Sequence, residues 1–327
     1  MILATLGHDL INLLYVLAAV CFIFGLKMLG KVETAARGNI ISAVGMLLAT
    51  VVTFFYITGG TWLSLLWIIP ALAIGGFAGT VMAHRVEMTQ MPQMVAILNG
   101  FGGIASMLVA LADYFHTLSM QRTHDQEVAG LIEIINAAVV NASYIAPTFF
   151  STGQIFATGL AVAIGAVTFS GSIMAFGKLQ GTAWAPDQPV QLPQQKWIVF
   201  GGLAFLALTI LFLMIWPGGW PWVLLMVLVA LGLGVLLVIG IGGADMPVVV
   251  ALLNSYSGVA AAMAGFVLNN YALIITGSLV GSSGLILTNI MCKAMNRSLM
   301  NVLFGGMGAA PAGVPASAGM ETQGTAT

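Results

Sequence analysis

Apolar runs of about 20 residues recur along the whole chain, and this pattern constrains the fold more than any other feature of the sequence. A run of that length is what an α-helix needs to cross the hydrocarbon core of a bilayer. Only 6% of the residues are charged and 60% are hydrophobic, whereas about a quarter of the residues in a typical soluble domain are charged. The sequence therefore predicts an all-α, polytopic membrane protein. A net charge of −1 without a basic cluster argues against a nucleic-acid partner.

Polar breaks divide these runs into nine predicted transmembrane helices. Their approximate ranges are 10–27, 39–58, 62–83, 92–112, 154–177, 197–216, 221–241, 246–268 and 271–293. Basic residues favour cytoplasmic loops. Eight of the nine Lys and Arg residues fall on one side under this scheme, and Arg122 alone falls on the other. The amino terminus is therefore predicted to lie outside and the carboxyl terminus in the cytoplasm.

Two segments lie outside the predicted spans. Residues 113–153 form a long outer connection, and we expect the stretch 128–150 to be an interfacial helix or a re-entrant cap, because polar residues interrupt it. Residues 1–304 are predicted to form the membrane domain. Residues 305–327 have the Gly-, Ala- and Pro-rich composition of a linker, and we expect this linker to lead to a cytoplasmic domain that is absent here.

Small and polar residues recur at helical spacing on the fourth, fifth, eighth and ninth predicted helices. In a bilayer such faces pack against other helices or line the interior of the bundle. The polar members that we single out are Asn99, Ser106 and Asp113 on the fourth helix, Thr168 on the fifth, Asn254 on the eighth, and Ser283 and Thr288 on the ninth. Asn99, Asn254 and Ser283 are expected at similar depths, roughly 10–15 Å from the cytoplasmic ends of their helices. The large apolar residues of the sixth and seventh helices indicate contact with lipid.

Asp245 is a lone carboxylate between the seventh and eighth predicted helices, in the run GGADMP at 242–247. A carboxylate is costly near hydrocarbon, so one in this position is a functional candidate by default. We interpret it as a titratable group at the inner mouth of a short water file between the polar helices. Two plainer interpretations stay open: Asp245 caps the following helix, and the polar faces serve only for helix packing.

Four motifs resemble one family. GGADMPVVVALLNSYSGVAAAMAG at 242–265, the block at 275–297, MPQMVAILNGFGG at 91–103 and TFSGSIMAFGKLQG at 168–181 are similar to the β subunit of the proton-translocating NAD(P)+ transhydrogenase. The resemblance implies hydride transfer from NADH to NADP+ in soluble domains that bind NAD(H) and NADP(H), coupled to proton translocation through the membrane domain. It implies a bacterial inner-membrane location. It also implies that this chain alone holds no nucleotide cofactor and is inactive in hydride transfer.

The same resemblance assigns roles to the positions that match its motifs. Asp245 matches the acid at the cytoplasmic mouth and Asn254 the channel asparagine. The close-packed channel segment is matched by Ser282, Ser283 and Gly284, and the coupling to the cytoplasmic domain by Lys293 and Arg297.

Position 99 departs from the family, because many relatives carry a histidine there that is regarded as the central proton relay. Asparagine cannot titrate. Partner α subunits are implied, and we expect a small membrane α subunit to supply the histidine within a dimeric assembly. No metal site is predicted. A secondary transporter or channel for a small solute remains the alternative function, although no internal repeat supports it, and a non-conducting membrane scaffold is a third.

Overall fold

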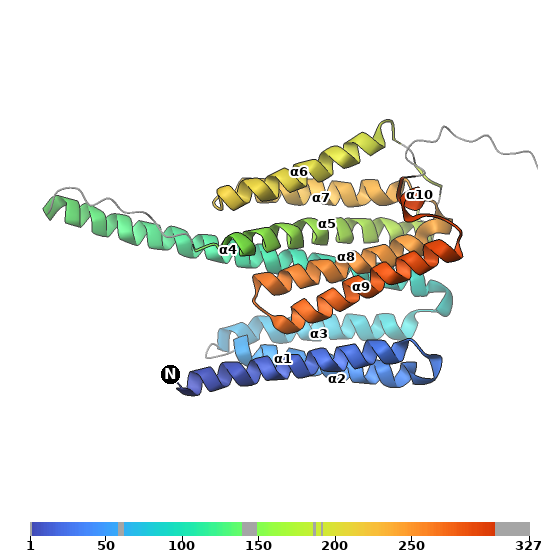
Figure 1. The fold of residues 1–327 in the computed structure, drawn as a ribbon, viewed down its shortest axis with the longest axis horizontal. Helices are drawn as coiled ribbons and strands as arrows, with labels where there is room; N and C mark the ends of the chain where they lie inside the picture. Colours follow the sequence, from blue (N-terminus) through green and yellow to red (C-terminus); the bar gives the residue numbers. More distant parts are fainter. Residues whose placement is uncertain (1, 58–61, 139–148, 186–187, 191, 305–327) are drawn as a thin grey trace, which may run out of the picture.

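The computed structural model describes residues 2–57, 62–138, 149–185, 188–190 and 192–304, and these residues fold into a bundle of long helices (Figure 1). Within that part of the chain, nine helices are long and apolar enough to cross a membrane. This confirms the nine predicted spans. The predicted linker at 305–327 lies outside the described residues.

The bounds of the elements follow the chain in order. They are α1 (Ile2–Leu29), α2 (Val32–Ile57), α3 (Trp62–Arg85), the 3-10 turn η1 (Met88–Gln90), α4 (Met91–Ala138), α5 (Thr152–Gln180), α6 (Gln195–Ile215), α7 (Trp220–Ile239), the 3-10 turn η2 (Gly243–Asp245), α8 (Met246–Val267), α9 (Tyr271–Ala294) and α10 (Leu299–Phe304). The sequence did not lead us to expect the short α10, which follows α9 after a four-residue connection.

The basic residues gather at one end of the bundle, on the right of Figure 1, where α1, α3, α5, α7 and α9 all end. This end is called the basic end below. The residues concerned are Lys27, Lys31, Arg37, Arg85, Lys178, Lys196, Lys293 and Arg297. Arg122 lies on the part of α4 that extends past the opposite end. The clustering agrees with the pattern expected of a cytoplasmic side, and the orientation of the termini stays a prediction.

Helix α5 forms the centre of the bundle. In its membrane-spanning window 72% of the residues are buried, more than in any other span, and α4, α7 and α8 pack around it. Helix α7 has a buried side and an exposed side, so the predicted contact with lipid applies to one side only: Met226, Ala230 and Leu233 are buried, whereas Leu228 is 65% exposed. A Cβ atom at Gly234 of α7 would lie 2.3 Å from the carbonyl oxygen of Val167 on α5. The missing side chain there lets the two backbones touch.

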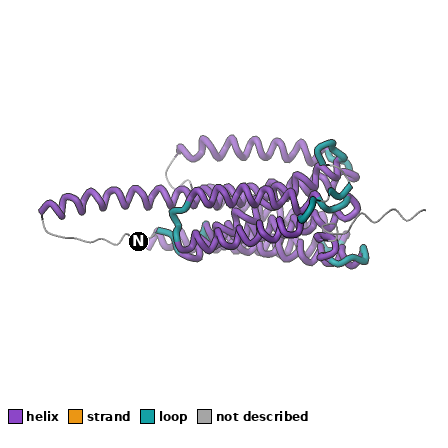
Figure 2. The backbone as a smooth tube through the Cα atoms, turned by 90° about the horizontal axis from the view of Figure 1, so that it is seen from above, coloured by secondary structure: helices purple, strands orange, loops and turns teal. Residues whose placement is uncertain are grey.

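Helix α4 is 48 residues long and projects well past the rest of the bundle (Figures 1 and 2). The expected separate interfacial helix or re-entrant cap after residue 128 is therefore wrong up to Ala138, and residues 139–148 lie outside the described part. The physical reason is that no proline follows Pro92 within α4, so nothing in this stretch forces the helix to end. Tyr114 ties α4 to the α6–α7 connection, because its hydroxyl donates to the carbonyl oxygen of Pro217 at 2.6 Å.

Helix α3 stands apart from the rest. No residue in its window Leu66–Arg85 is buried. A Cβ atom added at Gly75, Gly76 or Gly79 would meet nothing within 4 Å. By contrast, α1 and α2 pack closely on each other, and α1 also contacts α9.

Candidate functional site

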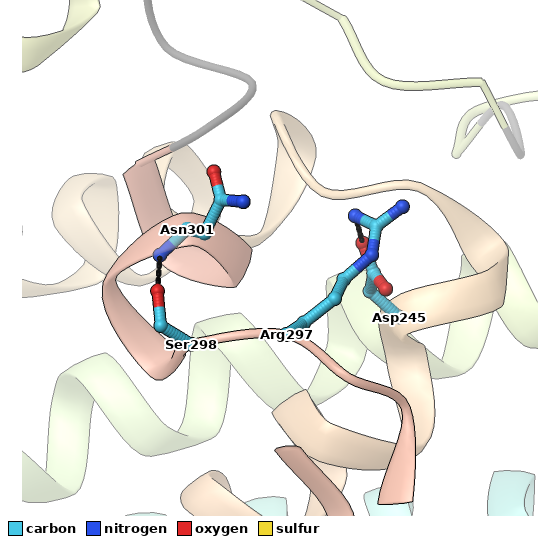
Figure 3. Close-up of polar contacts among 4 residues, drawn as sticks. All are labelled: Asp245, Arg297, Ser298 and Asn301. Carbon is cyan, nitrogen blue, oxygen red and sulfur yellow. Dashed lines mark hydrogen bonds and ion pairs between the residues drawn. The ribbon is translucent and has the colours of Figure 1, made fainter. Parts of the chain in front are cut away.

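Asp245 lies in the η2 turn at the basic end, where α7 gives way to α8 (Figure 3). Its Oδ2 atom accepts a hydrogen bond from Nη1 of Arg297 at 2.9 Å. The Asp245 side chain is 13% exposed and that of Arg297 is 51% exposed, so the pair lies at the boundary between the bundle and the outside. The second oxygen, Oδ1, is buried and has no hydrogen-bond partner among the described residues. The carboxylate therefore has an unused acceptor directed into the protein.

The connection between α9 and α10 brings Arg297 to this position. Helix α9 ends at Ala294, and Asn296 adopts a left-handed φ of 51°, a conformation that asparagine tolerates better than most residues. The N–H group of Arg297 then donates back to the carbonyl oxygen of Cys292 at 2.9 Å. In the next turn the hydroxyl of Ser298 accepts from the N–H group of Asn301 and caps α10. The ion pair thus links the start of α8 to the start of α10.

The alternative interpretation of Asp245 as a helix cap is wrong. Its side chain makes no capping hydrogen bond to α8. The reason is local backbone geometry: Asp245 already has helical angles, φ −92° and ψ −3°, whereas a capping residue usually has an extended conformation. The carboxylate is therefore available to Arg297.

Lys178 is a functional candidate that the sequence analysis missed. Its side chain is only 2% exposed, and its Nζ atom donates to the carbonyl oxygen of Ile241 at 2.9 Å and to that of Gln188 at 3.3 Å. Ile241 directly precedes the turn that carries Asp245. The position of Lys178 at the end of a span resembled that of any interfacial lysine, which hid its burial.

We expect Lys178→Met to lower the free energy of unfolding by about 1.5–3 kcal/mol, because the carbonyl oxygen of Ile241 loses a charged donor. Lys31→Met is the matched control, since Lys31 is exposed at the same end. The thermal unfolding midpoint of the two purified variants measures the difference. Equal midpoints would show that the buried ammonium group does not hold the turn.

Asn99 connects α4 to α8. Its side chain is 7% exposed, and Nδ2 donates to the carbonyl oxygen of Val250 at 3.2 Å. Three residues further along α4, a Cβ atom at Gly102 would lie 2.4 Å from the Oγ atom of Ser257 on α8. The seam between α4 and α8 is therefore closely packed at this level.

The contact between α8 and α9 depends on glycines and on Ser255. The hydroxyl of Ser255, 1% exposed, donates to the carbonyl oxygen of Gly281 at 2.7 Å. A Cβ atom at Gly284 would lie 2.7 Å from the backbone nitrogen of Ser255, so the predicted close packing at Gly284 is present in the structure. The sequence predicts a role for the neighbouring Asn254, which is half-buried and whose side chain makes no hydrogen bond to another described residue. Ser255 was missed because a serine and an asparagine in adjacent positions give no signal of which one faces the partner helix.

Five of the other predicted residues carry hydroxyl groups, and a sixth is the carboxylate Asp113. The hydroxyls of Ser106, Thr168, Ser282, Ser283 and Thr288 all donate to carbonyl oxygens of their own helices. Ser106, Thr168 and Thr288 are buried, whereas Ser282 and Ser283 are exposed. Asp113 is far from Asp245, near the opposite end of the bundle, where its Oδ2 atom accepts from Nε2 of Gln154 at 2.8 Å. The structure thus does not bring Ser282, Ser283 or Asp113 to the Asp245 turn.

A hollow of about 560 Å³ lies between the α1–α2 pair and the α8–α9 pair. It is lined by apolar side chains together with several polar ones, among them Asn39, Ser42 and Ser257. Ser257 follows Asn254 by three residues, so both lie on the same face of α8. The polar face of α8 is therefore open toward this hollow.

Comparison with known proteins places these features in one family. The family model described as "NAD(P) transhydrogenase beta subunit" matches residues 11–327. The chain is 42% identical over 312 residues to two proteins named "NAD(P) transhydrogenase subunit beta" from Rhodospirillum rubrum, one of them assigned to a particular strain. The matched region is 95% of this chain and 61% of each relative. This chain thus matches less than two thirds of the length of those relatives.

Proposed function

The chain belongs to the NAD(P) transhydrogenase beta subunit family, and from this membership we propose that it conducts protons in a complex that transfers hydride from NADH to NADP+. The observation that supports the proposal most directly is the ion pair between Asp245 and Arg297 at the basic end of the bundle. We propose that the soluble domains of the complex bind NAD(H) and NADP(H), and that this chain alone does not catalyse hydride transfer. The sequence shows no convincing internal repeat that would favour the solute-transporter alternative.

The chemistry of the pair supplies a coupling step. While Asp245 is ionised, its carboxylate holds the guanidinium of Arg297 at 2.9 Å. A proton that arrives at Asp245 neutralises the carboxylate and removes most of the attraction. Arg297 and the attached α10 are then free to take another position. Coupling of this kind requires a protonation event that favours one of two conformations, and the release of Arg297 is the conformational change that we assign to it.

We propose that protons enter at the end of the bundle opposite to the basic end, near Asp113, and reach Asp245 along the polar face of α8. Asn254 orients water on this route, Asn99 joins α4 to α8 beside it, and Ser106, Thr168, Ser282, Ser283, Gly284 and Thr288 line it or pack beside it. Lys293 and Arg297 pass the protonation state of Asp245 to a cytoplasmic domain. The route also needs a titratable group at the level of Asn99, and we assign this group to a partner subunit.

That partner is a small membrane α subunit that supplies a relay histidine. Two observations support its placement: the polar face of α8 opens to a 560 Å³ hollow, and α3 presents a glycine-rich surface that contacts nothing in the described chain. Small residues of this kind permit close approach of another helix. We further propose a dimer of the complete assembly in the bacterial inner membrane, with the basic end of the bundle in the cytoplasm.

Reconstitution tests the proposal. The chain is purified together with its partner subunits, placed in sealed liposomes with a pH-sensitive dye inside, and supplied with both nucleotides. We expect hydride transfer to be accompanied by a change of internal pH that an uncoupler abolishes. Hydride transfer without any proton movement would contradict the proposal. Uptake of a small solute by the chain without nucleotides would favour the transporter instead.

A further inference from the structure

A second hollow, of about 380 Å³, lies on the side of the bundle formed by α5, α6, α7 and α8. It is called the acyl groove below. Its walls are almost wholly apolar and include Val167 of α5, Leu237 of α7 and Leu252 of α8. Two of the lining residues carry a hydroxyl group: that of Ser255 is already bonded to Gly281, which leaves the phenol of Tyr256. The groove has no charged lining residue, and one phenol gives little to hold a polar solute.

The groove opens sideways, toward the surface that faces the bilayer. Two residues that line it, Leu203 of α6 and Leu285 of α9, are 44% and 49% exposed. Along α8 the lining extends from Val249 to Val259, which is roughly 15 Å at the rise of an α-helix. This is half of the roughly 30 Å hydrocarbon thickness of a bilayer. The groove thus has the depth of one leaflet, and it begins at the basic end.

The basic end of the groove carries an aromatic cover and a cation. Phe304 of α10 lines the groove and stacks on Phe200 of α6, with ring centroids 5.8 Å apart and planes inclined by 12°. Lys196 precedes Phe200 by four residues and therefore lies on the same face of α6, one turn nearer the aqueous boundary. The Lys196 side chain is exposed. A positive charge thus stands directly beyond the covered end of an apolar groove.

We propose that the acyl groove binds one tail of an anionic phospholipid from the leaflet at the basic end, with the phosphate beside Lys196. The apolar lining and the length of roughly 15 Å along α8, half of the hydrocarbon thickness, fit one acyl tail of a single leaflet. The charge selects the headgroup, since basic sites between transmembrane helices on the cytoplasmic side attract anionic lipids. A bound tail fills the space between α5 and α7 on one side and α8 on the other, and so supports the helix that begins at Asp245.

Two substitutions in the intact complex test the two halves of the site. Leu203→Trp narrows the open side of the groove, and Leu208→Trp is its control, because Leu208 is 64% exposed on another face of α6. Lys196→Gln removes the cation, and Lys31→Gln is its control at the same end. Each complex is purified in mild detergent and titrated with phosphatidylglycerol or phosphatidylcholine, and native mass spectrometry counts the lipids that remain bound.

We expect the unaltered complex and both controls to retain phosphatidylglycerol, and Leu203→Trp to lose it. Lys196→Gln should weaken phosphatidylglycerol binding about fivefold, the effect of one surface cation on an anionic lipid, and leave phosphatidylcholine unchanged. Retention by Leu203→Trp equal to that of Leu208→Trp would overturn the proposed groove. Equal affinity of the unaltered complex for the two lipids would overturn the role of Lys196.

Discussion

Replacing Asp245 with Asn in the assembled complex is expected to reduce proton-coupled turnover by at least about 100-fold, the usual contribution of a positioned acid or base. Asparagine has nearly the same shape and still offers an oxygen to Arg297, so the turn is expected to keep its structure. What it loses is the ability to exchange a proton and to alternate between a charged and a neutral form. The loss should appear in proton movement into liposomes and in the nucleotide reaction that is coupled to it.

The control for this substitution is Glu127→Gln, which removes an exposed carboxylate on the projecting part of α4. We expect this variant to pump normally. The thermal unfolding midpoint of Asp245→Asn should stay within a few degrees of the unaltered complex, which separates a lost proton step from a lost fold. Normal pumping by Asp245→Asn would remove the residue from the proton route and, with it, the central role of the ion pair.

Gly258→Ala is expected to cause a large loss of stability for the addition of a single methyl group. A Cβ atom there would lie 2.3 Å from the backbone nitrogen of Gly281 and 2.8 Å from the carbonyl oxygen of Gly277. Both are backbone atoms of α9 and cannot rotate aside, so the helices must separate. Overpacking of this kind costs about 3 kcal/mol, equivalent to a decrease of roughly 6–12 °C in the unfolding midpoint.

Gly232→Ala is the matched control, because a Cβ atom at Gly232 of α7 would meet nothing within 4 Å. Alanine also favours helix more than glycine does, by about 1 kcal/mol. This variant should therefore unfold at the same temperature as the unaltered protein or slightly higher. If Gly258→Ala were as stable as Gly232→Ala, α8 and α9 would not be in close contact at Gly258.

The helices of this fold were predictable because length and hydropathy decide them, whereas the contacts between helices were not. The pair Asp245–Arg297 joins residues 52 positions apart, and the sequence shows the acid and the base but not their meeting. Lys178 contacts the α5–α6 connection, where the carbonyl oxygen of Gln188 accepts from its Nζ atom and the N–H group of Val190 donates to the carbonyl oxygen of Ile239 at 3.1 Å. The amino-acid composition does not predict how this connection folds.

The candidate site divides in the same way. Chemistry that belongs to one residue, such as the lone carboxylate of Asp245, can be identified from the residue type and its setting. Which residue faces a neighbouring helix is harder to predict, because adjacent residues on a helix point about 100° apart and small residues are permitted on either side. Asn254 and Ser255 show the difficulty: both are polar and at the right depth, and only the position of α9 decides that Ser255 makes the bond between helices.

The part of α4 beyond Tyr114 is long enough for a small rotation of the helix to move its tip by several ångströms. Its fulcrum is Tyr114, which is fixed to the carbonyl oxygen of Pro217, and the helix continues beyond it as far as Ala138. That arm measures about 36 Å at 1.5 Å per residue. A swing of about 10° within the bundle therefore displaces the tip by about 6 Å. A small rotation of the buried half would therefore produce a larger movement of the projecting half, which a fluorescent label at Glu127 would report.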